Sequence, residues 1–249
     1  LSHYLPVLIA VGVLENVDAA RIKDIAMLRG ARNNQLAGYG VVVGLAGTGD
    51  KSNDLTEGSI GLMLKGLGID LKTQKIETKN VAAVMVATIL PPFTRLGSQL
   101  DVTVSSVGSA TSLDGGTLMM TALKGPDGKI YAMAQGKILF TKKDNKGGGG
   151  GGGALTCVIP NGAILEREVH LDISNQPLKY FLMNPDFTTA ARVAKRINEE
   201  LGGKFATASD PSSVEVISPF QYEGNPVELV AQIESIDVTP AFSEMNFKN

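Results

Sequence analysis

The ten residues VAAVMVATIL, numbered 81–90, decide how this chain folds. They form an unbroken apolar run that ends at Pro91 and Pro92, and proline cannot donate the hydrogen bond that would extend a ladder of strands. A continuous apolar run of this length, bounded by residues typical of turns, indicates a buried strand. We therefore expect residues 81–90 to form a central strand, or a pair of strands, of a sheet.

Short strands are also predicted on both sides of this run. Residues 39–45, YGVVVGL, are β-branched and bracketed by glycines, and residues 100–105, LDVTVS, alternate so that Leu100, Val102 and Val104 share one face. Further strands are expected at residues 117–121, 129–134 and 136–140, with a turn at Pro126-Asp127-Gly128. Asn53 or Asp54 is expected to cap a helix that runs to about Leu67, although three glycines weaken it.

The second half of the chain contains the clearest helix signal. Asp186 is placed to cap a helix over residues 187–201, and Gly202-Gly203 is placed to end it. Its predicted buried stripe consists of Phe187, Ala190, Ala194, Ile197 and Leu201. Strands are expected at residues 164–171, 178–183, 205–208 and 214–217, followed by an apolar segment at 227–238. The predicted fold class is α+β, with short, largely antiparallel or mixed strands, a few covering helices and two subdomains.

The domain boundaries follow from shifts in composition. Residues 1–20 contain the apolar run YLPVLIAVGVL and small residues before Arg21, so we interpret them as the remnant of a secretory signal peptide. Residues 21–141 are predicted to form a first α+β domain and residues 156–240 a second one. Between them, residues 142–155 are rich in lysine and glycine, and the seven glycines 147–153 are interpreted as a loop, a linker or an artefact. Residues 241–249 are an atypical tail.

The composition argues against several classes of function. The formal net charge is −2, and residues 1–20 contribute Glu15 and Asp18, so the remainder is neutral. This balance does not favour binding to nucleic acid or to anionic lipid. Tryptophan is absent and aromatic residues make up 5%, which disfavours stacking on bases or sugars.

The most suggestive motif for chemistry is GLAGTGDKS at residues 44–52. A phosphate-binding loop needs lysine directly after its second conserved glycine, but here Asp50 stands before Lys51 and places a negative charge where phosphate oxygens would lie. The glycines at 38, 40 and 44 also miss the dinucleotide-binding spacing. We interpret the stretch as a tight glycine turn and keep a nucleotide-binding enzyme only as a third hypothesis.

No catalytic, cofactor or metal set is predicted. His170 is expected in an alternating strand as an ordinary surface histidine, and Ser105-Ser106 has no general base near it in the sequence. Cys157, the single cysteine, stands at no metal-binding spacing and is interpreted as a small buried or unbridged thiol. Asp101, Asp114 and Asp127 are scattered over predicted strands and turns. We therefore expect a protein that is not an enzyme.

Several stretches, in one order along nearly the whole chain from Arg21 to about Pro240, resemble the bacterial flagellar P-ring proteins. They are Arg21-Ile-Lys-Asp-Ile25, Asn34-Gln-Leu-Ala-Gly-Tyr-Gly-Val-Val-Val-Gly-Leu45, Gly47-Thr-Gly-Asp50, Lys79-Asn-Val-Ala-Ala-Val-Met-Val86, Pro91-Pro-Phe-Thr-Arg95, Asp101-Val-Thr-Val-Ser-Ser106, Gly115-Gly-Thr-Leu-Met-Met-Thr121, Pro160-Asn-Gly-Ala163, Glu166-Arg-Glu168 and Asn184-Pro-Asp-Phe-Thr-Thr-Ala190.

The resemblance implies a structural subunit that is exported to the periplasm and closes into a ring with copies of itself. The partners that the resemblance implies are the distal rod, the L-ring protein, a periplasmic assembly chaperone and the peptidoglycan layer. The implied role of the subunit is that of a bushing. It also implies that Lys79 faces an acidic rod, which suits a bushing because exposed charge contacts contribute only about 0–1 kcal/mol each. The alternative for Lys79 is an ordinary solvated lysine.

The sequence departs from the family in two places. A second rod-facing lysine, expected shortly before Ser112-Leu113, is Thr111 here. The family chain also continues with a further segment that includes cysteines, so the chain is interpreted either as a truncated product or as a compact variant. The alternative function for the whole chain is a periplasmic module that binds the cell wall.

Overall fold

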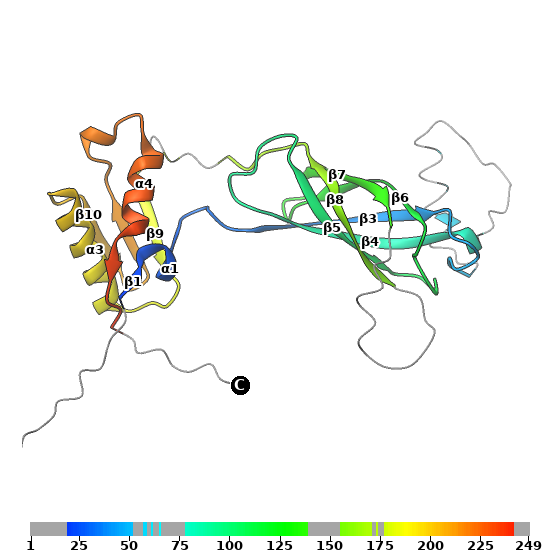
Figure 1. The fold of residues 1–249 in the computed structure, drawn as a ribbon, viewed down its shortest axis with the longest axis horizontal. Coiled ribbons are helices and arrows are strands. Elements are labelled where there is room, and N and C mark those ends of the chain that lie inside the picture. Colours follow the sequence, from blue (N-terminus) through cyan, green and yellow to red (C-terminus); the bar gives the residue numbers. More distant parts are fainter. Residues whose placement is uncertain are drawn as a thin grey trace, which may run out of the picture. The chain divides into compact units, whose positions relative to one another are not determined.

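The computed structural model describes residues 19–51, 57, 58, 61, 65, 78–138, 155–170, 173 and 177–241. The chain forms two compact units, shown in Figure 1. One comprises residues Ala31–Leu171 and is called the barrel unit below. The other combines Leu1–Gly30 with Asp172–Asn249 and is called the helical unit. The strands are antiparallel and the helices few, which confirms the expected α+β fold class.

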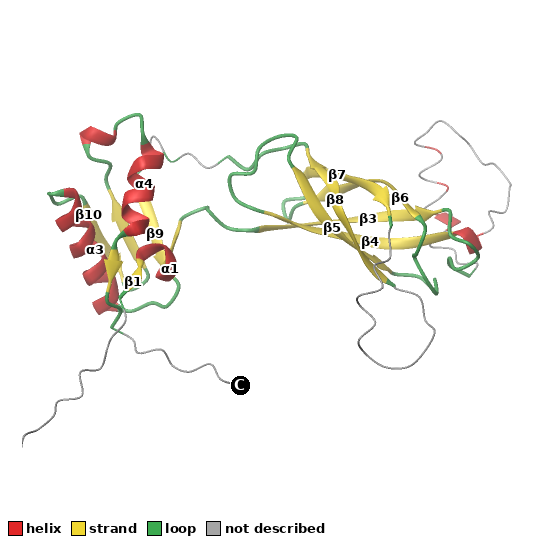
Figure 2. Cartoon of the chain, in the orientation of Figure 1, coloured by secondary structure: helices red, strands yellow, loops and turns green. Residues whose placement is uncertain are grey.

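Six strands of the barrel unit close into a barrel. Figure 2 draws these strands in yellow. In chain order they are β3 (Asn34–Val43), β4 (Val81–Leu90), β5 (Gln99–Ser106), β6 (Thr117–Lys124), β7 (Ile130–Lys137) and β8 (Thr156–Leu165). Around the barrel the order is β3-β4-β5-β8-β7-β6, and every neighbouring pair is antiparallel. Closure satisfies the backbone hydrogen bonds of strands that would otherwise form exposed edges.

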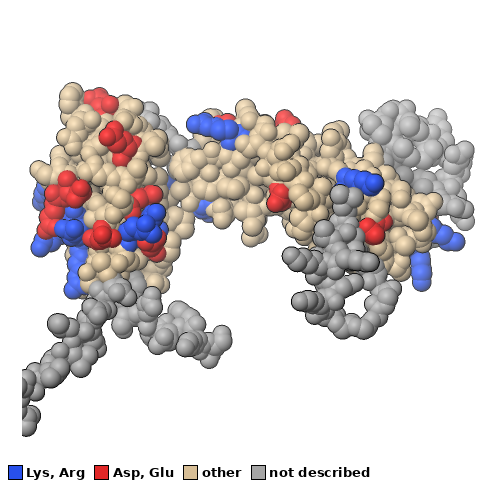
Figure 3. Space-filling view, in the orientation of Figure 1, with Lys and Arg blue, Asp and Glu red and all other residues tan. Residues whose placement is uncertain are grey.

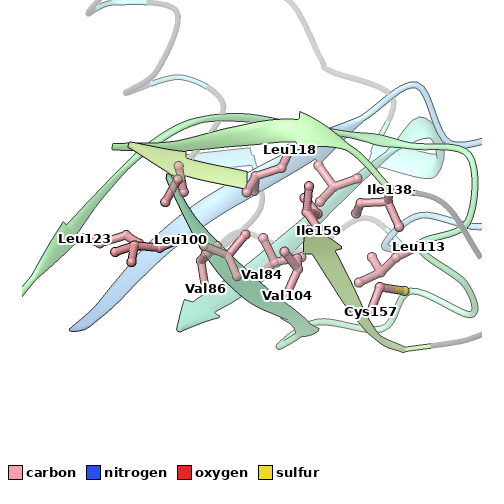
Figure 4. Close-up of a cluster of buried hydrophobic side chains, with 14 of the residues drawn as sticks. Val84, Val86, Leu100, Val104, Leu113, Leu118, Leu123, Ile138, Cys157 and Ile159 are labelled. Atoms are coloured by element: carbon pink, nitrogen blue, oxygen red, sulfur yellow. The ribbon is translucent and has the colours of Figure 1, made fainter. Parts of the chain in front are cut away.

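The predicted central strand is confirmed as β4, which pairs with β3 along its whole length and with β5 on its other side. Its alternate residues Val84, Val86 and Leu90 are almost completely buried. They meet Leu100, Val102 and Val104 of β5, the face predicted from alternation, inside the barrel. Figure 4 shows this interior with Cys157 and Ile159 of β8 and Leu118 of β6. Burying these side chains contributes about 1.5–3 kcal/mol each to folding.

β8 corrects the strand predicted at residues 164–171. The strand ends at Leu165, and the exposed His170 lies beyond it and in no strand. β8 begins at Thr156 because its first half pairs with β5. A bulge at Asn161, whose φ is 53°, interrupts the alternation of inward residues, and the Asp101 carboxylate accepts a 2.8 Å hydrogen bond from the Asn161 N–H. This broken alternation hid the strand from sequence analysis.

The other predicted elements of the barrel unit need smaller corrections. The strands expected at residues 129–134 and 136–140 form one strand, β7, with a register shift opposite β6. A short 3₁₀ helix, η1 (Thr78–Asn80), precedes β4. The helix predicted from Asn53 or Asp54 to Leu67 and the glycine run 147–153 lie largely or wholly outside the described residues.

The helical unit contains a four-stranded antiparallel sheet in the order β10-β11-β9-β2. Its strands are β2 (Ala26–Leu28), β9 (Leu178–Leu182), β10 (Ala206–Asp210) and β11 (Ser213–Val216). α1 (Ile22–Ile25), η3 (Phe220–Tyr222), α4 (Pro226–Ser235) and the small pair β1 (Ala20–Arg21) and β12 (Asp237–Val238) complete it. The predicted apolar segment 227–238 therefore spans a helix and a short strand.

The long helix α3 (Phe187–Leu201) begins and ends as predicted. The Asp186 carboxylate accepts a 2.6 Å hydrogen bond from the Thr189 N–H, and Gly202 takes a φ of 70° at the other end. Hydrogen bonding by the Thr189 side chain, and then by its backbone N–H, lowers the pKa of Asp186. Phe187 is a correction, because it is 75% exposed while Val193 is buried in the stripe instead. Its position in the first turn lies outside the face that α3 turns to the sheet.

The division between the units falls at Gly30/Ala31 and Leu171/Asp172, whereas the predicted domains met within residues 142–155. The reason is strand pairing: β7 and β8, on either side of residues 142–155, pair with each other in one barrel. At the other boundary, β2 of the N-terminal segment pairs with β9, so this segment belongs to the helical unit.

Candidate assembly site at one end of the barrel

The glycine-rich turn 44–50 connects the end of β3 to the rest of the barrel. Gly44 and Gly47 have positive φ values of 80° and 77°, which non-glycine residues rarely adopt. The Leu45 N–H donates to the Asn80 carbonyl (3.0 Å), and the Asp50 N–H donates to the Val81 carbonyl (2.8 Å). The turn is therefore fastened to η1 and to the start of β4.

Asp50 is fully buried at the centre of this turn. Its carboxylate accepts backbone hydrogen bonds from Ala83 at 2.9 Å and from Ala110 at 2.7 Å. A Cβ atom on Gly108 would lie 2.2 Å from one of its oxygens, so only glycine fits there. The carboxylate thus joins the turn, β4 and the loop 107–114. The motif that looked most like a phosphate-binding loop thus contains a buried side chain whose two oxygens are bonded to the backbone of Ala83 and Ala110.

Lys79 lies on the outside of the same cluster. Its backbone carbonyl accepts a 2.8 Å hydrogen bond from the Gly49 N–H, while its side chain is exposed. Thr111, the position where the resemblance implies a second lysine, is also exposed, and its N–H donates to the Thr48 carbonyl at 2.8 Å. Residues 79 and 111, which are far apart in sequence, therefore flank the Thr48-Gly49 dipeptide at one end of the barrel.

The remaining sequence candidates are not brought together with this site. Among the described residues, no group of three or more histidine, cysteine or acidic side chains is placed to hold a metal ion. Cys157 is buried among the barrel core residues, and desolvation by this burial raises the pKa of its thiol. The Ser105 hydroxyl lies 3.2 Å from that of Thr156 on the neighbouring strand. Asp127, in the β6–β7 turn, accepts a 3.0 Å hydrogen bond from the hydroxyl of Tyr131 in β7.

Sequence analysis did not identify Asp50 as the residue that holds this site together. It recognised Asp50 only as an obstacle to phosphate binding. A charged residue within a turn of glycines that follows a buried strand is the signal that was present, because such a charge needs buried donors. The identity of those donors depends on the fold.

The closed barrel and the turn 44–50, which is hydrogen-bonded to η1 and β4, place the exposed side chains of Lys79 and Thr111 at one end of the barrel unit. The class of protein is shown by the comparisons with known proteins. A family model described as "Flagellar P-ring protein" matches residues 21–245, and the chain therefore belongs to the flagellar P-ring protein family. This family is a structural component of the basal body of the bacterial flagellum.

Curated relatives bear the same description. The chain is 45% identical to the flagellar P-ring protein of Bdellovibrio bacteriovorus over 229 residues, which are 92% of this chain and 67% of the relative. It is 48% identical to that of Rhodospirillum rubrum over 229 residues, 89% of this chain and 60% of the relative. The relative from Nitratidesulfovibrio vulgaris is 44% identical over 245 residues, 96% and 67% of the two chains. The chain thus spans roughly three fifths to two thirds of these relatives.

Proposed function

We propose that this chain is a subunit of the flagellar P-ring that assembles with copies of itself around the rod, as a bushing in the peptidoglycan layer of the periplasm. The observation that carries the proposal is the family match over residues 21–245, which includes both structural units. The turn 44–50 at the barrel end adds a physical reason, because its hydrogen bonds hold the backbone of the exposed Lys79 in place.

Within this function, Lys79 is the residue proposed to face the rod. Its backbone is held by the hydrogen bond from Gly49, so the charge is delivered at a defined place. Its side chain is exposed and hydrated, so a contact with an acidic rod is weak and easily exchanged. With Thr111 in place of a second lysine, Lys79 alone supplies the implied charge at these two positions.

The proposed location and partners extend the coarser result that the chain belongs to the basal body. Residues 1–20 are proposed to direct export, and the L-ring protein, an assembly chaperone and peptidoglycan are the proposed neighbours. Among the described residues, none of the helices combines the length and the hydropathy that crossing a bilayer requires.

The test is expression in the periplasm of a flagellated bacterium that lacks its own P-ring gene, with and without a C-terminal segment taken from a relative. We expect the chain in purified basal bodies, visible as a ring by electron microscopy. Absence from basal bodies even with the added segment would overturn the proposal. Tight binding of the isolated monomer to purified peptidoglycan would favour the alternative of a cell-wall-binding module.

A charge variant tests the role of Lys79 separately. We expect Lys79→Glu to leave the rings visible but to reduce swimming, because it would place a negative charge against an acidic rod. Lys51→Glu is the matched control, since Lys51 is exposed and its backbone N–H is anchored to Ser109 in the same cluster. Equal swimming of the two variants would show that Lys79 is an ordinary solvated lysine.

A further inference from the structure

A groove of about 1000 Å³ lies over the outer face of β3, β4 and β5. Its floor includes Ala37, Ala87 and Thr103, which face one another across the three strands. The β6–β7 turn forms one wall through Lys124 and Pro126. A smaller hollow of about 470 Å³ shares Ala37 and Lys124 with the groove and continues to Tyr39 and Met85.

The outward residues of β4 make this groove unusual for a surface. Met85 and Ile89 are 44% and 57% exposed, and Ala87 between them is exposed as well. A strand with one face in the core and the other in water normally has polar residues on its outer face. Apolar residues on both faces of β4 indicate that its outer face is covered when the protein works. None of the described residues covers it.

The helical unit carries the most exposed large apolar side chain among the described residues. Phe220, in η3, is 90% exposed. The turn around it is closed by hydrogen bonds from the Tyr222 N–H to the Pro219 carbonyl and from the Glu223 N–H to the Phe220 carbonyl. An aromatic side chain on a preformed turn loses little conformational freedom when it binds, which favours the use of Phe220 as an anchor.

We propose that the groove on β3, β4 and β5 receives the Phe220 turn of a second copy of this chain. This inference rests on the proposed function, because a ring requires each copy to contact the next. The groove volume is at the upper end of the range for pockets that enclose small molecules, about 300–1000 Å³, so it has room for a short turn and not only for one ring.

Charge supports a second copy as the occupant. Residues 31–171 contain 14 lysines and arginines against 11 aspartates and glutamates, a net charge of +3, whereas residues 21–30 and 172–249 contain 9 against 12, a net charge of −3. On the face shown in Figure 3, charged side chains are dense over the helical unit and sparse over the barrel unit. The exposed Lys124 stands at the groove wall, and the exposed Glu223 follows the Phe220 turn. Complementary charge favours this pairing over contacts between like units.

The geometry of such a contact suits a ring. The groove and the Phe220 turn are different surfaces, so their contact is head-to-tail and leaves one of each surface open on a pair of copies. Repetition of a head-to-tail contact generates a closed ring when the rotation closes.

Disulfide cross-linking tests the contact, because the one native cysteine, Cys157, is buried. Phe220→Cys and Ala87→Cys variants are made separately, mixed and oxidised mildly. We expect a cross-linked dimer that needs both variants. The matched control pairs Ala87→Cys with Phe187→Cys, because Phe187 is 75% exposed elsewhere on the helical unit. Equal yields from the two mixtures, or no dimer from the Phe220→Cys mixture, would overturn the inference. If a chain that carries both Phe220→Cys and Ala87→Cys forms only an intramolecular cross-link, the inference would also be overturned.

Phe220→Ala separates this inference from the proposed function. Because Phe220 is almost fully exposed, we expect the variant to fold with an unchanged melting temperature. Its incorporation into basal bodies should fall by roughly tenfold or more, the loss typical of an aromatic anchor. Incorporation equal to that of the unchanged chain would refute the groove contact and leave the ring function standing. If the unchanged chain is absent from basal bodies, the proposed function fails, and the cross-link still decides the contact.

Discussion

Replacing Asp50 with asparagine should loosen the barrel unit selectively. The carboxylate accepts hydrogen bonds from the backbone N–H groups of Ala83 and Ala110, one on each oxygen. Asparagine has nearly the same shape, but its NH₂ group would point a donor at one of these N–H groups. The backbone N–H that faced the replaced oxygen would lose this acceptor in a fully buried position.

The magnitude follows from the two hydrogen bonds. A buried donor without a partner costs about 1–3 kcal/mol, and the surviving bond to a neutral oxygen is weaker than one to a charged oxygen. We therefore expect Asp50→Asn to reduce the free energy of unfolding of the barrel unit by about 2–4 kcal/mol. The stability of a typical domain is about 5–15 kcal/mol, so the variant should still fold.

Amide hydrogen exchange measured by mass spectrometry can follow each unit separately. The slowest amides of β4 and β5 should exchange roughly 30-fold to 700-fold faster, because each 1.4 kcal/mol is a factor of ten in the opening equilibrium. Amides of α3 in the helical unit serve as the internal reference. Asp114→Asn is the control, since Asp114 is exposed in the adjoining loop and should change stability by less than about 0.5 kcal/mol. Equal exchange in the two variants would refute the view that Asp50 holds the site together.

Three further predictions follow from single residues. Hydrogen bonds from Ser212 and then Ser213 lower the pKa of Asp210 to about 2. The contribution of Asp210 to stability should therefore be full above pH 4 and should fade as the pH falls towards 2. Asp210→Asn should make the melting temperature less dependent on pH over that range, and an unchanged dependence would contradict this. The buried Cys157 thiol should react with Ellman's reagent only on unfolding, and a rapid reaction in native protein would show that the core opens. Gly202→Ala should lower the stability of the helical unit by about 1–2 kcal/mol in thermal melts, because a left-handed φ is costly for alanine, and a neutral result would place the end of α3 elsewhere.

The helix α3 shows what sequence alone can predict. Its cap at Asp186 and its terminator at Gly202 act within a few residues of the helix ends, so both bounds follow from local chemistry. β4 was equally clear, since a ten-residue apolar run leaves few alternatives. Phe187 was misassigned because the direction of a first-turn side chain depends on what α3 packs against.

Closure of the barrel was beyond sequence analysis. It depends on pairs such as Leu100 with Ala163 and Val42 with Leu118, which join segments that are distant in the chain. The bulge at Asn161 concealed β8, and without β8 the strands at its two sides cannot be joined. Part of the candidate site could be predicted, because the resemblance pointed to Lys79, whose role in facing the rod stays a prediction. The hydrogen bonds that place Lys79 beside Thr111 are long-range and appear only in the fold.

The glycines of the turn 44–50 could serve either to bind phosphate or to allow close packing, and the short distances around them favour close packing. A Cβ atom on Gly49 would lie 2.4 Å from the Val81 carbonyl oxygen, and one on Gly108 would overlap the Asp50 carboxylate. Glycine is therefore required here by the approach of backbone to backbone and of backbone to Asp50. The same compactness fixes the carbonyl of Lys79 while leaving its side chain in water. Under the proposed function this combination is useful, because a bushing needs charge at a fixed position and contacts too weak to hold a turning rod.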